Sequence, residues 1–244
     1  MIDLLVERSA GGGPWMAHWI GGAGCCWIDG DRDILVGRAA AEAGRYLAWR
    51  SIWQPAFGRP AGAARILEEV RTAGGPVGVS GSPMAIFARD RAPVATADVI
   101  EAFDVADHAW ADIGRSIARL SPARRSTPPS AGRRTIEETL EHLGNCFWWY
   151  CSRIDDVLPD WPDAGLSFEE RAGAFLRSAR AWCIERAGLG GPAASGTKAV
   201  VPTRYPTDDP EEQWTLAKVI RRQAEHLWEH LGTVERDAGG DRDG

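Results

Sequence analysis

Residues 216–236 read LAKVIRRQAEHLWEHLGTVER, and this stretch decides the fold. Apolar residues recur in it at the spacing of one face of an α-helix, namely Leu216, Ile220, Leu227, Leu231 and Val234. Charged residues take the opposite face, which predicts a long amphipathic helix with one face in a core. His226 and His230 border the apolar face, about 40° apart on the helical wheel and one turn from each other.

Three further amphipathic helices are predicted before this stretch, all of them after Pro93. The first begins near Thr96 and runs as far as Leu120. The second and the third begin after Thr135 and Ser167, because a glutamate follows each of these residues three positions later. That spacing predicts a capping box, in which two side chains satisfy free backbone N–H groups at the start of a helix. Four such helices predict an all-α four-helix bundle.

The first third of the chain has a different pattern, with short alternating segments and turns rich in glycine. Strands are predicted over residues 2–7, 15–20, 25–29, 66–70 and 84–88, and a helix over residues 33–53. A loop of about 25 residues before the last helix has the length of a functional loop or a long crossover. The fold class is therefore α+β, and we predict a small α/β domain at residues 1–92, a four-helix bundle at 93–237 and a disordered tail at 238–244.

The composition excludes several classes of protein. The chain has 244 residues, 44% of them hydrophobic and 25% charged, as in globular rather than disordered or fibrous proteins. It has no run of 18 apolar residues and no basic, apolar leader, so we expect a cytoplasmic protein without a membrane span or an export signal. The net charge of −6 argues against a nucleic-acid partner. The five cysteines lack the paired spacing of a zinc site, which indicates reduced thiols.

Three histidines on two of the predicted helices indicate a metal site. On the second predicted helix, His142 also borders the apolar face, with Cys146 beside it. Border positions on two helices of a bundle can face each other, so His142, His226 and His230 can together hold one divalent metal ion and leave a coordination position open. A lone histidine pair four residues apart is more often a surface feature. The zinc-protease pattern His-Glu-x-x-His is absent, because Leu227 follows His226.

Other residues give weaker signals. His108 lies away from the apolar face of its helix and is predicted at the surface, while His18 lies in a strand with no partner that the sequence identifies. The chain has twelve tryptophans, and Trp148 and Trp228 fall on outer helix faces. Exposed aromatic residues of this size predict an interface with the other domain or with a second subunit.

Two segments together carry a family resemblance: residues 135–143, TIEETLEHL, and residues 219–230, VIRRQAEHLWEH. They resemble the second and fourth helices of the DinB/YfiT-like superfamily, over roughly residues 95–236. The resemblance implies a four-helix bundle with a long connection. It also implies a divalent ion such as nickel or zinc, held by one histidine of the second helix and a His-x-x-x-His pair of the fourth, which are His142, His226 and His230 here.

The N-terminal third resembles, less closely, the HicB-like small α/β domain. The matching positions are Met16 to Trp19, Gly24-Cys25, Gly30-Asp31 and a helix that ends at Tyr46-Leu47-Ala48-Trp49. Residues 20–23 read IGGA where that family often has a turn with proline. We take only the fold from this resemblance.

The DinB resemblance implies two kinds of chemistry. Some of these enzymes transfer or isomerise substrates with a low-molecular-weight thiol, and others are regarded as metal-dependent hydrolases. A metal ion lowers the pKa of a bound water or thiol and so makes a nucleophile near neutral pH. Glu138 is a candidate base and Cys146 a candidate reactive thiol. The alternatives are a helix cap for Glu138 and a buried structural role for Cys146.

Three functions remain open at this stage. The first is a metal-dependent enzyme acting on a small-molecule substrate. The second is a non-enzymatic ligand-binding or stress-response bundle, with the N-terminal domain as an interaction module. The third is an antitoxin-like regulator, which the acidic balance disfavours. Many bundles of this kind form dimers, so a homodimer is expected.

Overall fold

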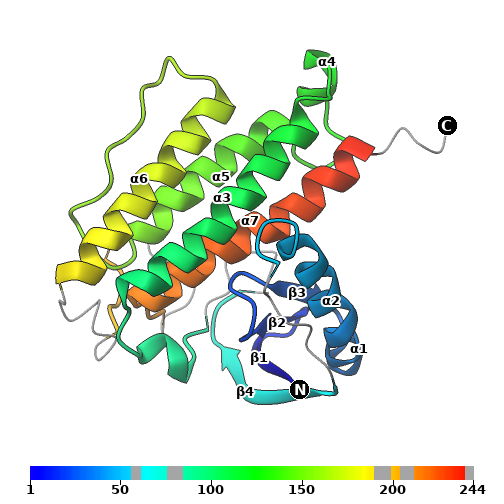
Figure 1. Ribbon diagram of the computed structural model, residues 1–244, viewed down its shortest axis with the longest axis vertical. Coiled ribbons are helices and arrows are strands. Elements are labelled where there is room, and N and C mark those ends of the chain that lie inside the picture. Colours follow the sequence, from blue (N-terminus) through cyan, green and yellow to red (C-terminus); the bar gives the residue numbers. More distant parts are fainter. Residues whose placement is uncertain (56–61, 76–84, 190–198, 204–211, 240–244) are drawn as a thin grey trace.

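The structure is a computed structural model that describes residues 1–55, 62–75, 85–189, 199–203 and 212–239. It has a small N-terminal sheet with two helices, followed by a helical region (Figure 1). The strands are β1 (Ile2–Ser9), β2 (Trp15–Trp19), β3 (Cys26–Asp29) and β4 (Ala64–Thr72). The helices beside them are α1 (Arg32–Gly37) and α2 (Ala39–Arg50). The α+β class expected from the sequence is confirmed.

The sheet has the strand order β3-β2-β1-β4. Strand β1 pairs antiparallel with β2, where Leu4 lies opposite Trp19, and parallel with β4. Strand β1 is central and mostly buried, whereas β4 forms an edge and alternates between half-buried and exposed residues. Helix α2 turns Ala43, Tyr46 and Leu47 into the core.

Four long helices pack side by side in the rest of the chain (Figure 1). They are α3 (Thr96–Ile117), α5 (Ile136–Cys151), α6 (Phe168–Leu189) and α7 (Leu216–Gly239), with the short η1 (Ala88–Arg91) and α4 (Pro122–Arg125) between them. Helix α3 packs mainly on α7, and α5 mainly on α6. The approach of α5 to α6 is close at Gly144, where an added Cβ would lie 2.9 Å from Cδ2 of Phe175.

Helix α7 also joins the helical region to the sheet. Its Trp228 is buried, with ring centroids 5.1 Å from both Tyr46 and Trp49 of α2. This is the contact with the other domain that the outer position of Trp228 predicts. Most buried hydrophobic side chains of the sheet and of the helices form one continuous cluster, and a small second cluster holds Leu5, Ala85 and Phe87. The two parts therefore share a core.

Some local predictions are wrong in detail. The helix predicted over residues 33–53 is two helices, α1 and α2, which meet at Gly37-Arg38, and residues 51–53 form a turn after α2. The strand predicted over residues 84–88 is not a strand over 85–88, while residue 84 lies outside the described residues. The N–H groups of Ala85 and Phe87 donate to the side chains of Glu7 and Asp90. These two N–H groups therefore do not form the backbone hydrogen bonds of a strand.

The ends of two predicted segments also differ from the structure. Helix α7 includes the first two residues of the predicted tail, 238 and 239, and residues 240–244 lie outside the described part. Most of the predicted long loop before α7 lies outside it as well. At the end of that loop, Val200 forms an isolated bridge with Trp214.

Candidate metal centre

Helices α5 and α7 bring two histidines into direct contact. Nε2 of His142 lies 3.1 Å from Nε2 of His226. Cys146, one turn after His142 on α5, joins them in a group whose ligand atoms all lie within 4.8 Å of one another. His230, one turn after His226, adds a third imidazole, with its ring centroid 4.6 Å from His226 and 5.3 Å from His142. The spacing in the sequence thus corresponds to one cluster in space.

Burial and nearby positive charges keep the imidazoles of the cluster neutral. Burial, and then the charge of Arg134, lower the pKa of His142 to about 4. Burial also lowers the pKa values of His226 and His230 well below their ordinary value. A neutral imidazole offers a free lone pair, which is the form that binds a metal ion. The buried Nδ1 atoms of His226 and His230 have no hydrogen-bond partner among the described residues. The facing Nε2 atoms of His142 and His226, with the unpaired Nδ1 of His230 beside them, form a donor set that fits a divalent ion.

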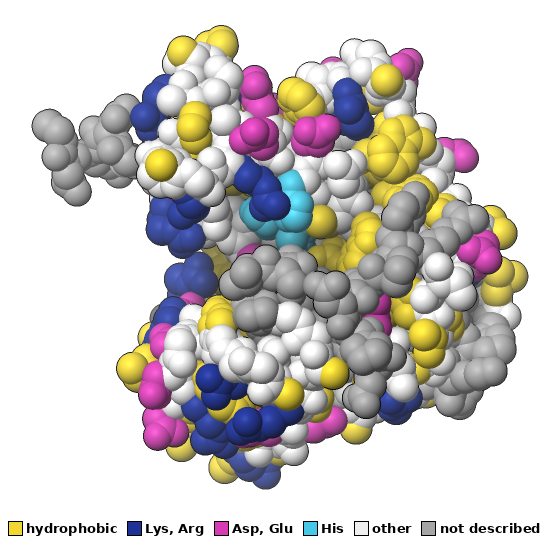
Figure 2. Space-filling model, turned by 180° about the vertical axis from the view of Figure 1, so that it is seen from behind, with side chains coloured by type: hydrophobic (Ala, Val, Ile, Leu, Met, Phe, Trp, Pro, Cys, Tyr) yellow, Lys and Arg dark blue, Asp and Glu magenta, His cyan; other side chains and the backbone are white. Residues whose placement is uncertain are grey.

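The cluster is reachable from solvent. His142 and His230 are partly exposed, whereas His226 is buried. Figure 2 shows histidine side chains at the surface on this face of the molecule, beside Lys or Arg and Asp or Glu side chains. A small molecule can therefore approach the imidazoles from this side.

The two candidate catalytic residues lie in different settings. Glu138 completes the capping box of α5, where its Oε2 accepts from the N–H of Thr135 at 2.7 Å. Its carboxylate is thus engaged at the helix start. The Cys146 Sγ lies 3.6 Å from Nδ1 of His142, and burial raises the pKa of this thiol to about 12. Without a bound cation Cys146 is therefore a neutral thiol, so its chemistry depends on a metal ion.

A carboxylate and a guanidinium lie behind the histidines. Oε2 of Glu229 lies 3.5 Å from Nδ1 of His226. The same oxygen lies 3.5 Å from Nη2 of Arg222, which is fully buried. Both residues come from α7, one turn from the histidine they flank. Sequence reasoning assigned Glu229 to the polar face and missed this role.

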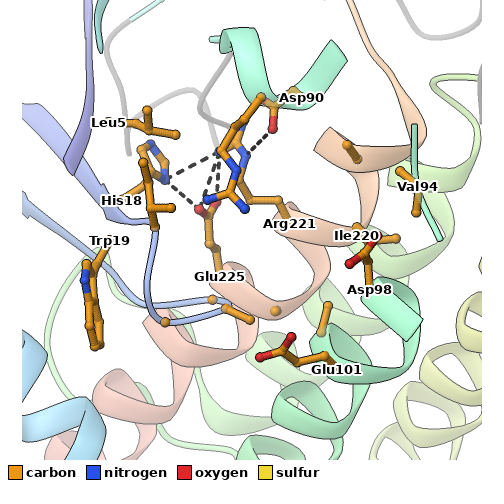
Figure 3. Close-up of a pocket in the computed structure, with 18 of the residues that line it drawn as sticks. Leu5, His18, Trp19, Asp90, Val94, Asp98, Glu101, Ile220, Arg221 and Glu225 are labelled. Carbon is orange, nitrogen blue, oxygen red and sulfur yellow. Dashed lines mark hydrogen bonds and ion pairs between the residues drawn. The ribbon is translucent and has the colours of Figure 1, made fainter. Parts of the chain in front are cut away.

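A second polar cluster joins α7 to the sheet (Figure 3). His18 on β2 is buried between two carboxylates, with Nδ1 2.6 Å from Glu225 and Nε2 2.9 Å from Glu7. Burial acts to lower the pKa of His18, but the charges and hydrogen bonds of the two carboxylates outweigh it and raise the pKa. Arg221 also faces Glu225 and forms an ion pair with Asp90 at 2.8 Å. His18 therefore has partners that sequence reasoning could not find.

His108 lies apart from both clusters. Its ring stacks on Trp53 with centroids 3.9 Å apart, and its Nδ1 lies 2.8 Å from the carbonyl oxygen of Asp104. It is half-buried rather than a free surface residue. Its contacts are structural, between α3 and the turn that follows α2.

The helical part of the chain can be assigned by comparison with known families. A sequence model of the DinB superfamily matches residues 106–234, which is more than half of the chain. The chain belongs to the DinB superfamily. The match includes helices α5 and α6, most of α3 and α7, and all three histidines of the cluster. No curated protein and no solved structure matches this DinB protein.

The match leaves out the first 105 residues of this DinB protein, so the HicB-like resemblance of its sheet stays a prediction. Among its described residues, no helix combines the length and the apolar character needed to cross a bilayer.

A cavity of about 380 Å³ lies where the sheet meets the helical region of the DinB protein. Its walls include the loop at residues 20–24, the start of α3 and the face of α7 that carries Arg221 and Glu225 (Figure 3). Asp98 and Glu101 of α3 also line it. None of the three clustered histidines does, so the cavity and the histidine cluster lie on different sides of α7.

Proposed function

We propose that this DinB-superfamily protein binds one divalent metal ion through His142, His226 and His230 and acts with it on a small molecule. The observation that carries the proposal is the 3.1 Å approach of the two Nε2 atoms in a partly buried group with neutral imidazoles. Imidazole suits zinc and nickel, and a neighbouring thiol is also a ligand that zinc accepts. Zinc or nickel is therefore the expected ion.

The proposed reaction class follows from what such an ion supplies. An ion held by His142, His226 and His230 would lower the pKa of a bound water or thiol toward neutrality. A metal-dependent hydrolase and a thiol-dependent transferase or isomerase both use a nucleophile of this kind. The protein's own residues hold the ion, leave one side open to solvent and keep the opposite side dry.

The capping contact of Glu138 disfavours it as the proton acceptor of the reaction, because its carboxylate already accepts from a backbone N–H group. This favours a nucleophile that the metal ion itself activates. It also favours a substrate or cofactor thiol, whose ordinary pKa is about 8.5 and thus much closer to neutrality than that of water.

Cobalt substitution tests the proposal. The untagged full-length protein, stripped with a chelator and loaded with Co²⁺, is expected to show the visible absorption of a tetrahedral or five-coordinate ion. His142→Ala and His226→Ala are expected to lose that absorption. If the wild-type protein gives only the spectrum of aqueous Co²⁺, the proposal fails.

A thiol titration then separates the two reaction classes. Added 2-mercaptoethanol is expected to produce a sulfur-to-cobalt charge-transfer band if the open position accepts a thiol. The Cys146→Ser variant is the control, because Cys146 can give such a band by itself. A spectrum that the thiol leaves unchanged would favour the hydrolase over the thiol-dependent enzyme.

The second candidate function is non-enzymatic ligand binding, and the cavity beside Arg221 and Glu225 favours it. A volume of about 380 Å³ suits a small organic ligand. A small-molecule screen read by thermal shift tests this alternative. Ligands that stabilise the wild-type protein and a His142→Ala/His226→Ala double variant equally would support it.

A further inference from the structure

We propose that Glu229 is the positioning residue for His226, and that the N-terminal sheet holds Glu229 in place through Cys26 and His18. The inference rests on the proposed metal site, and it assigns a role there to a domain outside the family match. According to this proposal, residues of the sheet hold in place the carboxylate that orients a metal ligand.

The orientation of His226 is the first step. Its Nε2 points to Nε2 of His142, so a metal ion shared by the two rings binds at that nitrogen. The proton of the neutral ring then resides on Nδ1, and this N–H needs an acceptor. Nδ1 is buried and lacks a hydrogen-bond partner among the described residues. The Glu229 carboxylate lies 3.5 Å away, within reach of a small side-chain rotation.

The second step is how Glu229 is held. Arg222 lies on one side, with Nη2 3.5 Å from Oε2 of Glu229. On the other side, the thiol of Cys26 on β3 lies 3.6 Å from Oε1. The carboxylate is thus placed between a residue of its own helix and a residue of the sheet.

The third step leads from Arg222 to the centre of the sheet. Nη1 of Arg222 donates to Oε2 of Glu225 at 2.8 Å, and the other carboxylate oxygen of Glu225 meets His18 at 2.6 Å. His18 in turn meets Glu7 of β1 at 2.9 Å. Figure 3 shows His18 and Glu225 pointing toward each other from β2 and α7. The chain of contacts therefore runs from β1 through β2 to the residue beside the metal ligand.

Because these contacts are buried, a change at one of them is expected to move the residues of the next. Glu7, Arg222 and Glu225 are nearly inaccessible to water. A buried charge keeps its partner, because breaking the pair leaves an uncompensated charge in a medium of low dielectric. A change at His18 is therefore expected to displace Arg222 and, with it, Glu229.

The proposal is tested by the zinc affinity of the full-length, untagged protein. This affinity is measured by competition with a chromophoric chelator. Removing such an outer carboxylate typically weakens metal binding about 10–100-fold. We expect this loss for Glu229→Ala and a smaller one for Glu229→Gln, whose amide oxygen still accepts from the Nδ1 proton. Glu235→Ala, at an exposed position of the same helix, is the matched control and is expected to bind as the wild type does.

The Co²⁺ spectrum separates positioning from a general loss of stability. Glu229→Ala is expected to shift the visible bands, and Glu229→Gln to restore them in part. His18→Gln is expected to weaken zinc binding several-fold, although it lies on another domain. If Glu229→Ala binds zinc and Co²⁺ as the wild type does, the proposal is overturned while the metal site stands. If the wild-type protein binds neither ion, both fail together.

Discussion

At the residue scale, His18 shows how one buried proton can hold two parts of the protein together. It lies between Glu7 and Glu225, which belong to the sheet and to α7. Burial opposes the charge of each carboxylate, yet the contacts with His18 and Arg221 outweigh it and lower the pKa values of both. Below its ordinary pKa of 6.5, His18 therefore carries a positive charge between two negative ones. Arg221 and Arg222 also pair with Glu225, so further positive charge offsets the two carboxylates in a place that excludes water.

The substitution His18→Gln is expected to lower the free energy of unfolding by about 3–5 kcal/mol at pH 6, because it leaves two buried carboxylates short of a positive charge. The raised pKa of His18 stabilises the fold fully below its ordinary value of 6.5, and this contribution is lost as the pH rises through the raised value. The difference between wild type and variant is thus expected to shrink as the pH rises above 6.5.

Chemical denaturation at several pH values measures this difference. The contribution of Lys218 to stability rises with pH instead, since burial lowers its pKa to about 7. Because Lys218 is present in both proteins, this contribution cancels in the comparison. A difference that stays constant or grows between pH 6 and pH 10 would contradict this assignment of the proton.

The two kinds of histidine also show what the sequence can predict at this scale. His142, His226 and His230 could be grouped because helical periodicity placed them beside apolar faces. His18 could not be placed, since its partner Glu225 is 207 residues away in the chain. Glu229 was assigned to a polar face because the wheel does not show that the sheet covers that side of α7. Local periodicity therefore identifies the inner histidines but not the residues that surround them.

At the element scale, helix α5 depends on its capping box. Glu138→Ala is expected to lower the free energy of unfolding by about 0.5–1.5 kcal/mol, because a backbone N–H group at the helix start loses its acceptor. Zinc affinity is expected to stay unchanged, since Glu138 belongs to the cap. Glu137→Ala is the control, because it removes a charge from the same turn but leaves the box intact.

Thermal unfolding and zinc titration of both variants check this. A Glu138→Ala protein with wild-type stability and a lost enzymatic activity would instead identify Glu138 as the base. The box itself was visible in the sequence, and it placed the starts of α5 and α6 correctly. The segment at 85–88 was predicted wrongly, because side chains from distant elements take the hydrogen bonds that a strand would use.

At the scale of the whole molecule, the sheet docks on α7 through a tight contact at Gly24. This residue has φ +79, and an added Cβ would lie 2.9 Å from Cβ of Ala224 and 3.0 Å from its backbone carbon. Gly24→Ala is therefore expected to lower the free energy of unfolding by about 2–4 kcal/mol, from backbone strain and overpacking together. Gly44 lies in α2 with open space around it. Gly44→Ala is expected to stabilise the protein by about 0.5–1 kcal/mol.

Urea denaturation of the two variants compares these effects directly. Equal stabilities for Gly24→Ala and Gly44→Ala would mean that the sheet does not dock on α7 in this way. The sequence left two interpretations of the outer position of Trp228, an interface between the two parts or one with a second subunit. It gave no orientation for them, because the contacts at Gly24 and His18 join residues about 200 positions apart.

The metal site is the central claim, and the number of ions per chain tests it most directly. Native mass spectrometry of the untagged protein, stripped with a chelator and then supplied with zinc, counts the bound ions. We predict one zinc ion per chain in the wild-type protein and none in His142→Ala or His226→Ala. A wild-type protein that binds no zinc or nickel, or variants that bind as much as it does, would contradict the account.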